Sequence, residues 1–520
     1  MINLYKGHSY EIFVVELDNE LSAENDDKLR WLLKGAKRID KKAMEGSFIG
    51  PRKEMITPWS TNAVEITQNM GISGIKRMER FVDVEEAKIT YDPMLQRKYS
   101  IIDQQIFTID VLPEPVKFVE DITAYNKQEG LALSQPEIDY LEKVSDHIER
   151  KLTDSEVFGF SQVNSEHCRH KIFNGQFIID GISRNDSLFE LIKKTTRLNP
   201  NLVVSAYKDN VAFIKGPETI QFAPGRQDMP DFFKEKKIKT VLSLKAETHN
   251  FPTTVEPFNG ASTGSGGEIR DRMAGGKGSI PLAGTAVYMT SYPRINQKRK
   301  WENVFKERKW LYHNPEEILI KASNGASDFG NKFGQPLICG SLLTFEHEED
   351  RQKYGYDKVI MLAGGIGYGK ESDSMKDKPQ KDDKIVVMGG DNYRIGMGGG
   401  AVSSVDTGEY ESNIELNAVQ RANPEMQKRV YNALRAMSEN DENHIISLHD
   451  HGAGGHLNCL SELVEDSGGK IHVSKLPVGD STLSAKEIIG NESQERMGLV
   501  IHKKNYEELK KIAERERAPI

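Results

Sequence analysis

One stretch of the sequence gathers side chains that bind metals, phosphates and protons. Lys245, Glu247 and His249 alternate at the end of an apolar run, Thr240–Ala246, that predicts a β-strand. Sites in α/β proteins usually lie at the carboxyl ends of strands. We therefore expect this strand to deliver a lysine, a carboxylate and a histidine to one site.

A glycine-rich stretch follows, with four glycines and three hydroxyl residues between positions 260 and 267. Glycines let backbone N–H groups approach a ligand closely, so the stretch predicts a loop that forms an anion nest for a polyphosphate. Glu247 and Asp271 flank it and are oxygen ligands of the kind Mg²⁺ shares with phosphates. Arg270 has the fork geometry for a phosphate or carboxylate. The alternative is a surface loop with turn glycines; a Walker A sequence is not present, since 276–278 fails that pattern.

Two further clusters carry histidines. His167 and His170, three residues apart with Cys168 between them, are expected on one helical face, as metal ligands, as part of a Cys–His pair, or simply on a polar helix. Asp450 follows a predicted strand, His444–Leu448, and precedes a glycine turn among three histidines. Without a second ligand motif, this cluster favours a magnesium ligand over a zinc site.

The elements around these residues predict a multidomain α+β and α/β protein. The N-terminal part alternates strands and a helix, and a Gly/Pro-punctuated loop is expected to cap a helix after Ser60. A polar stretch, Glu371–Lys384, is expected to connect domains. The elements predicted in chain order are the strand Tyr10–Leu17, the helix Ala23–Leu33, the strand Ile101–Val111, the helical linker Pro136–Lys151 running into Phe158–Asn174, and the strands Val359–Gly364 and Lys384–Met388.

Two helices are predicted near the C-terminus. Asn423 is a good N-cap and Pro424 a good first-turn residue for a helix with an apolar face. The last helix, Asn505–Glu516, has helical apolar spacing and is followed by no closing strand. Because an α/β domain rarely ends so, we expect the last domain to be truncated.

Composition limits the class of protein. The formal charge of -8 over 520 residues argues against nucleic acid as the main partner. Three widely spaced cysteines fit neither a disulfide framework nor a zinc site and favour a reducing, cytoplasmic compartment. No apolar run is long enough to span a membrane, and the N-terminus lacks the pattern of a secretion signal.

Five motifs together resemble the large, single-chain type of phosphoribosylformylglycinamidine synthase, also called formylglycinamide ribonucleotide amidotransferase. The resemblance covers nearly the whole chain, and the motifs stand in the family's order: SEHCRHKIFN (Ser165–Asn174), ETHNFPT (Glu247–Thr253), the glycine-rich Gly260–Asp271, ASNGASDFGNKFGQ (Ala322–Gln335) and ESQERM (Glu492–Met497).

The resemblance implies a layout of four domains. These are an N-terminal regulatory-subunit-like α+β domain (1–130), a linker domain (131–215), an A-type α/β domain with the ATP loop (216–380) and a B-type domain (381–520) of the aminoimidazole-ribonucleotide-synthetase superfamily. The family continues with a second A–B pair and a glutaminase, both missing from this chain, so the isolated fragment is expected to be inactive.

The resemblance also implies a reaction in purine biosynthesis. With ATP and Mg²⁺, formylglycinamide ribonucleotide is converted to formylglycinamidine ribonucleotide through an iminophosphate, with ammonia that a glutaminase releases from glutamine.

The implied site residues fall into four groups. The catalytic residues are His249, as general base, and His167. The magnesium ligands are Glu247, Asp271 and Asp450. The substrate contacts are Thr248, Asn250, Arg270, Gln420, Glu492, Ser493 and Gln494. The ATP site comprises Lys245, His170, Gly260, Ala261, Ser262, Thr263, Gly264, Ser265, Gly266, Gly267, Glu268, Ile269, Arg270 and Asp271.

The sequence departs from the family pattern at one position, and two other functions are consistent with parts of it. Many relatives have a histidine where this chain has Phe251, which can neither ligate nor titrate. A non-catalytic nucleotide-binding scaffold would need the glycines but no general base. Another ATP-using member of the superfamily, such as a selenophosphate synthetase, would lack the N-terminal domain and the SEHCRHKIFN motif.

Overall fold

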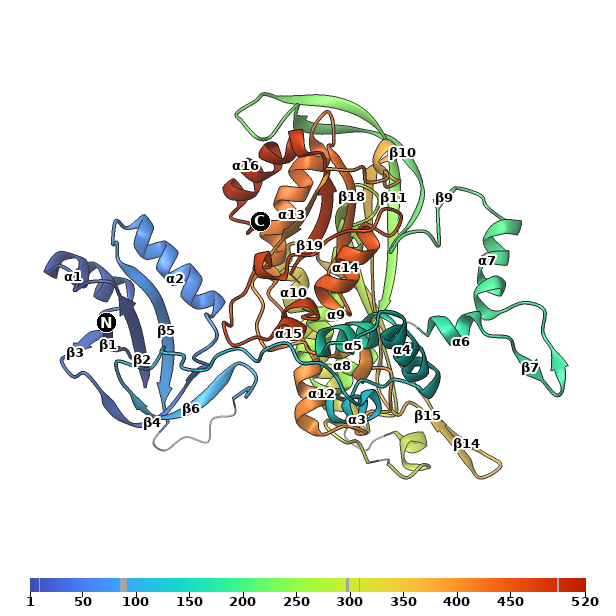
Figure 1. Cartoon of the computed structure of the whole chain (residues 1–520), viewed down its shortest axis with the longest axis horizontal. Coiled ribbons are helices and arrows are strands. Elements are labelled where there is room, and N and C mark those ends of the chain that lie inside the picture. Colours follow the sequence, from blue (N-terminus) through green and yellow to red (C-terminus); the bar gives the residue numbers. More distant parts are fainter. Residues whose placement is uncertain (9, 85–90, 168, 296–298, 308, 493–494) are drawn as a thin grey trace. The chain divides into compact units, whose positions relative to one another are not determined.

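The computed structural model describes residues 1–8, 10–84, 91–167, 169–295, 299–307, 309–492 and 495–520. The chain forms two compact units. The first comprises Met1–Glu114 with two short segments from later in the chain, Asp391–Tyr393 and Val478–Ser484. The second contains all of the remaining described residues. Figure 1 labels many of the elements of both units.

The first unit is built on a six-stranded antiparallel sheet in the order β3-β1-β2-β5-β4-β6. Apolar residues occupy both faces of its strands: Phe13 and Val15 pack with the helices, whereas Ile12 and Val14 pack on the opposite face. Its elements are β1 Ile2–Lys6, β2 Glu11–Leu17, α1 Ala23–Leu32, β3 Lys37–Ile39, β4 Met44–Pro51, α2 Pro58–Asn69, β5 Ile75–Asp83 and β6 Gln96–Ile102.

The predicted elements of this unit are confirmed in part. The strand at 10–17 and the helix at 23–33 are present as β2 and α1. The predicted strand Ile101–Val111 is wrong beyond Ile102, because the Asp103 side chain accepts a hydrogen bond from the Gln105 backbone and turns the chain. Helix α2 begins before Ser60 rather than after it: Thr57 is its N-cap and accepts from the Ser60 N–H.

The second unit contains the other six-stranded sheet, ordered β13-β12-β16-β11-β10-β9. All of its pairs are antiparallel except β12–β13, which is parallel. Figure 1 shows β10 and β11 as a long hairpin that arches beyond the sheet. The strands are β9 Val203–Ser205, β10 Ala212–Pro224, β11 Phe233–Thr248, β12 Ile280–Thr290, β13 Leu337–Thr344 and β16 Ile360–Lys370.

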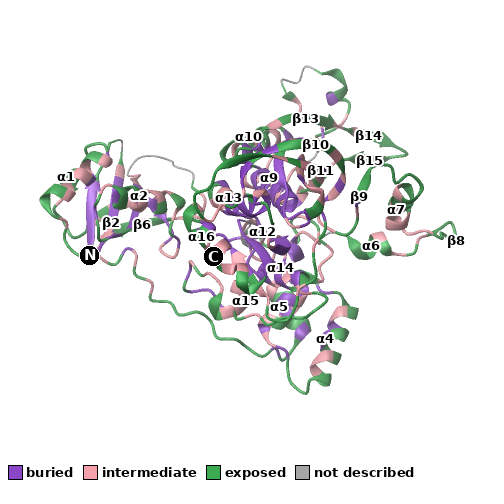
Figure 2. Cartoon of the chain, turned by 90° about the horizontal axis from the view of Figure 1, so that it is seen from above, coloured by how far each residue is buried: buried purple, intermediate pink, exposed green. Residues whose placement is uncertain are grey.

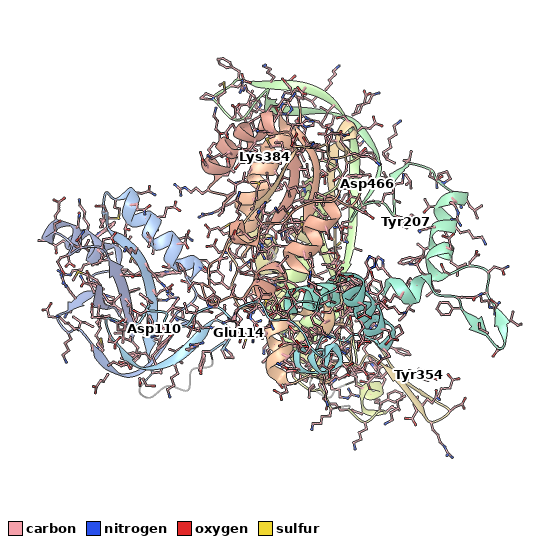
Figure 3. All side chains as sticks on the ribbon, in the orientation of Figure 1. Asp110, Glu114, Tyr207, Tyr354, Lys384 and Asp466 are labelled. Carbon is pink, nitrogen blue, oxygen red and sulfur yellow. The ribbon has the colours of Figure 1, made fainter. Side chains whose placement is uncertain are left out.

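Three helices pack on this sheet: α8 Asn250–Val255, α9 Pro257–Met273 and α10 Pro315–Phe333. Small side chains allow close contact, since Ala261 of α9 and Ala322 of α10 share a core with Met361 of β16. Helix α9 is almost entirely buried, as its colour in Figure 2 shows. The hairpin of β14 Glu346–Glu349 and β15 Gln352–Gly355 extends away from the sheet and carries Tyr354 (Figure 3).

A three-stranded sheet, β17-β19-β18, forms the other half of this unit. Its strands are β17 Lys384–Met388, β18 Ile445–Asp450 and β19 Met497–Ile501, and its main helices are α13 Pro424–Glu439, α14 Gly455–Leu463 and α16 Tyr506–Glu516. The α13 prediction is confirmed, because Asn423 caps the Met426 N–H and Pro424 occupies the first turn. Val430 and Leu434 of this helix are buried, and each contributes roughly 1.5–3 kcal/mol.

The linker is helical but interrupted. Helices α3 Ile122–Glu129, α4 Gln135–His147 and α5 Asp154–Val163 share a core. The predicted continuous helix Phe158–Asn174 is wrong: α5 ends at Val163, and α6 begins only at His170 after Arg169 adopts φ +55°. The smaller elements are β7 Ile178–Ile179, β8 Ile182–Ser183, α7 Leu188–Leu198, α11 Gly399–Val402, α12 Ser412–Ala418, α15 Ala485–Ile489 and the 3₁₀ turns Lys300–Asn303, Glu371–Asp373, Val473–Lys475 and Lys503–Asn505.

The predicted fold class, mixed α and β in several layers, is confirmed. The four domain boundaries stay a prediction; the stretch after Glu371 connects two parts of the same compact unit. Within the described ranges, no helix combines the length and the apolar character needed to cross a bilayer.

Candidate functional site

A chain of charges links β11 to the last turns of α9. Lys245 and Glu247 lie two residues apart and so share one side of the strand. The Lys245 Nζ lies 3.0 Å from Glu247 Oε2 and 2.7 Å from Asp271 Oδ2. The predicted lysine and two of the predicted acids therefore meet.

Asp450 joins this group from β18. It is the last residue of the strand rather than just beyond it. The Asn210 Nδ2 donates to Asp450 Oδ1 at 2.9 Å and to Asp271 Oδ1 at 3.1 Å, while Arg270 Nε lies 3.9 Å from Asp450 Oδ2. We call Lys245, Glu247, Asp271 and Asp450 the acid group.

Asp271 and Asp450 are buried, Lys245 and Glu247 are half-buried, and the charges of the four residues act on one another. Burial and the charge of Asp450 raise the pKa of Asp271 well above its usual value. Burial also acts to raise the pKa of Asp450, but the charges of His449 and Arg270 lower it. Burial acts to lower the pKa of Lys245, and the charges of Asp271 and Glu247 outweigh it and raise that pKa. A proton or a cation is therefore favoured between Asp271 and Asp450.

The donor set suits Mg²⁺ better than a metal held by protein alone. Among the described residues, no three His, Cys, Asp or Glu side chains gather closely enough to hold a metal ion. Mg²⁺ commonly takes one or two carboxylates and completes its octahedron with water and substrate phosphates. Asp271 and Asp450, both within hydrogen-bond reach of one nitrogen, match that requirement.

His249 packs against the other end of α9. Its Nδ1 lies 2.6 Å from the Gly260 carbonyl oxygen. A carbonyl only accepts, so Nδ1 carries the proton and Nε2 keeps its lone pair. Burial lowers the pKa of His249 to about 4, against smaller opposing effects that include the charge of Glu247. The ring is neutral near pH 7 and offers Nε2 as a proton acceptor.

The predicted anion nest at 260–271 is wrong, because these residues form helix α9. Backbone N–H groups within a helix are used by the helix itself. The glycines instead permit close packing: a Cβ at Gly260 would collide with the Pro252 backbone, and one at Gly266 would lie 2.7 Å from Phe329. Ser262, Thr263, Ser265, Glu268 and Ile269 are buried within these contacts.

Arg270, a predicted contact of both substrate and ATP, also lies on α9, and its side chain is fully buried. Its Nη1 donates to Gln427 Oε1 at 2.9 Å, and Gln427 in turn donates to the Gly266 carbonyl at 3.0 Å. Burial lowers the pKa of Arg270, while Asp450 and Glu495 oppose that effect. The guanidinium is therefore fixed beside the acid group.

Two predicted substrate contacts form a second group around Gly396–Gly400. Gln420 Nε2 donates to the Gly396 carbonyl at 3.4 Å, and the Glu492 N–H donates to the same oxygen at 3.1 Å. The Glu492 carboxylate accepts from Gly400 and Gly454, each at 3.2 Å. Burial raises the pKa of Glu492 to about 7.

The two linker histidines are separated by the break in the helix. His167 Nδ1 lies 2.7 Å from Ser403 Oγ, next to α11. His170 opens α6 and packs edge-on against Phe189 of α7, 5.6 Å between ring centres. The prediction that both share one helical face is wrong, and the structure does not bring His170 to the acid group.

The remaining predicted residues have mixed placements. Thr248 is the exposed last residue of β11, and Asn250 accepts from the Met361 N–H at 3.1 Å as α8 begins. Ser493, Gln494 and Cys168 lie outside the described residues. The histidines near Asp450 have separate partners: His449 pairs with Glu462, and His451 Nε2 lies 2.9 Å from His456 Nδ1.

Sequence reasoning missed Asn210, Gln427 and the Gly396–Gly400 run. The four glycines among these five positions could have been recognised in the sequence as a segment whose backbone other groups approach closely. Asn210 and Gln427 are single polar residues without a local motif, and only the tertiary fold places them beside Asp271 and Arg270.

Three family models match the chain. The formylglycinamide ribonucleotide amidotransferase N-terminal model matches residues 10–104, and the linker-domain model of the same enzyme matches residues 122–171. The C-terminal domain model of AIR-synthase-related proteins matches residues 380–520. Together the matches cover more than half of the chain.

Solved structures show a related fold. PurL of Thermotoga maritima complexed with FGAR is 24% identical with a TM-score of 0.51, over 73% of this chain and 50% of that one. The T. maritima PurL complex with ATP is 22% identical with a TM-score of 0.47, over 73% and 49%. The chain thus spans about half the length of these two PurL structures.

Proposed function

The chain belongs to the formylglycinamide ribonucleotide amidotransferase family, and we propose that it carries a Mg²⁺–ATP and substrate site for conversion of formylglycinamide ribonucleotide to the amidine. The family's substrate is consistent with the FGAR bound to the T. maritima relative. Glutamine, hydrolysed by a glutaminase, is the proposed source of the ammonia.

One observation carries the proposal: Lys245, Asp271 and Asp450 converge from three distant segments, with Arg270 fixed beside them. Phosphoryl transfer to an amide oxygen needs positioning and charge neutralisation more than covalent chemistry by the protein. When bound, Mg²⁺–ATP supplies the phosphoryl group and part of that neutralisation. Asp271 and Asp450 would hold the metal, and Lys245 would balance the acids.

His249 is the proposed proton acceptor. Its Nδ1–H bond to Gly260 leaves Nε2 free to take the proton that the attacking ammonia loses as phosphate departs. His167, within hydrogen-bond distance of Ser403, is a second proposed catalytic residue. Arg270, Gln420 and Glu492 are proposed substrate contacts, and the neutral form of Glu492 could donate a hydrogen bond as well as accept.

Replacing His249 tests the assignment. His249→Ala should lower ammonia-dependent amidine formation by about 10²–10⁴-fold, because the proton acceptor is lost. ATP binding, measured by calorimetry, should persist, since the acid group is unchanged. His347→Ala, at an exposed histidine of the β14–β15 hairpin, is the matched control.

Two results would defeat the proposal. Unchanged turnover in His249→Ala would remove the role of the base. Nucleotide that never exchanges, with no ATP hydrolysis when formylglycinamide ribonucleotide is added, would favour a non-catalytic scaffold.

A further inference from the structure

Asn210 occupies the position between the two buried acids. It lies in the turn that joins β9 to β10, and its one amide nitrogen donates to both Asp271 and Asp450, at 3.1 and 2.9 Å. The two acids are 61 and 240 positions away along the chain. An NH₂ group has two hydrogens, so each carboxylate receives one.

The backbone of this turn is fixed by the preceding residue. One oxygen of Asp209 accepts from the Gly276 N–H at 2.8 Å, and the other is 2.7 Å from Lys376 Nζ. Gly276 belongs to the turn that follows α9, the helix that carries Asp271. Asp209 therefore ties the Asn210 turn to the same helix end, and Asn210 is held in place rather than lying in a loose loop.

The amide is a neutral group in a place that attracts positive charge. Two buried carboxylates facing one point favour a proton or a cation there. The Asn210 side chain also carries an oxygen on the same planar group, and oxygen is the ligand atom that Mg²⁺ prefers. A half-turn about the last side-chain bond exchanges the amide nitrogen for that oxygen.

We propose that Asn210 is a residue of the metal site: its amide N–H groups hold Asp271 and Asp450 together when no cation is present, and its carbonyl oxygen turns toward a divalent cation when one is bound. This inference rests on the metal site of the proposed function. It adds to that site a third protein oxygen, from a neutral side chain, and a turn braced by Asp209.

Mn²⁺ binding to the 520-residue chain tests the inference without any catalytic turnover. Free Mn²⁺ is measured by electron paramagnetic resonance with and without a non-hydrolysable ATP analogue. Asn210→Ala should weaken Mn²⁺ binding about tenfold, as loss of a metal-site partner commonly does. Asn443→Ala is the matched control: that amide likewise donates twice, to the Lys277 carbonyl and to Asp373, but away from the acid group, and Mn²⁺ affinity should not change.

A second variant guards against misfolding of the first. Asn210→Asp keeps the shape of the side chain and places another carboxylate beside Asp271 and Asp450. Without a cation, repulsion between these carboxylates should lower the unfolding temperature. Mn²⁺ should then raise the unfolding temperature more than it does in the unaltered chain.

The outcomes separate the inference from the proposed function. Mn²⁺ affinity that is equal or tighter in Asn210→Ala, or a Mn²⁺ shift no larger in Asn210→Asp, would overturn the inference alone and leave Asn210 a structural strut. If the unaltered chain binds no Mn²⁺ even with the ATP analogue, the proposed metal site is wrong, and this inference falls with it.

Discussion

Two glycine-rich segments of the second unit look alike in sequence but use their glycines differently. In residues 260–267 the glycines lie inside α9, where Gly260 lets the helix approach the Pro252 backbone. Residues 396–400 lead into α11: Gly398 precedes that helix with φ +72°, and the Gly400 N–H, in its first turn, donates to the Glu492 carboxylate. A glycine-rich segment thus predicts that another group approaches the backbone closely. The tertiary fold determines whether that group is a neighbouring helix or a carboxylate.

The largest expected effect concerns the anion held at the second segment. Glu492 is buried, and its pKa is raised from 4.5 to about 7. A raised carboxyl pKa stabilises the fold below pH 4.5, and that contribution is lost as the pH rises through 7, about 3 kcal/mol in all. Glu492→Gln keeps an acceptor for the N–H groups and should be more stable than the unaltered chain above pH 7.

The measurement is the unfolding temperature of both proteins between pH 4.5 and 8. The two curves should nearly coincide at the acid end and separate toward pH 8. Glu316→Gln, at an exposed glutamate of α10, is the control and should give parallel curves. Parallel curves for Glu492→Gln as well would mean that the carboxylate is not held as described.

Gly260→Ala should disrupt the packing of α9 in the first glycine-rich segment. The added Cβ meets immobile backbone of residues 252 and 253, so we expect a loss of about 2 kcal/mol in unfolding free energy. Gly267→Ala in the same helix is the matched control: its nearest neighbour is the Arg270 side chain at 3.6 Å, and relief of helix entropy should stabilise by about 0.5 kcal/mol. Denaturant unfolding of the two variants that gave equal results would argue against close packing at Gly260.

The smallest effect is expected at Gly398. Nothing lies within 4 Å of a Cβ there, so alanine should cost only the left-handed backbone conformation, about 1 kcal/mol. Asn tolerates that conformation better, and Gly398→Asn should recover part of the loss in thermal unfolding. An alanine variant as stable as the unaltered chain would contradict the φ value.

Local signals in the sequence predicted those elements that local interactions specify. Asn423 and Pro424 begin α13 through contacts within one turn, and the apolar run at β2 needs no distant partner to be recognised. The prediction of a continuous helix through the linker was wrong, because Arg169 adopts a left-handed conformation that its residue type does not predict. The resemblance to a known family indicated the fold class that the structure has.

Distant packing decided what sequence reasoning missed. Helix α9 contains four glycines in eight positions, each costing helix propensity, and it is stabilised by neighbours such as Phe329 that a local pattern cannot reveal. The acid group was predicted as a set of residue types, and Lys245, Asp271 and Asp450 do meet. Asn210 could not be predicted, since its two partners lie in other elements far along the chain.

The opposed directions of β11 and α9 have a consequence for the shape of what the site can accept. Lys245 faces the carboxyl end of the helix, whereas His249, four residues further along, touches Gly260 near its start. Four residues of extended chain measure about 13 Å. A compact ion can therefore contact either Lys245 or His249 but not both. A ligand that contacts both residues must be elongated, as two reactants bound end to end would be.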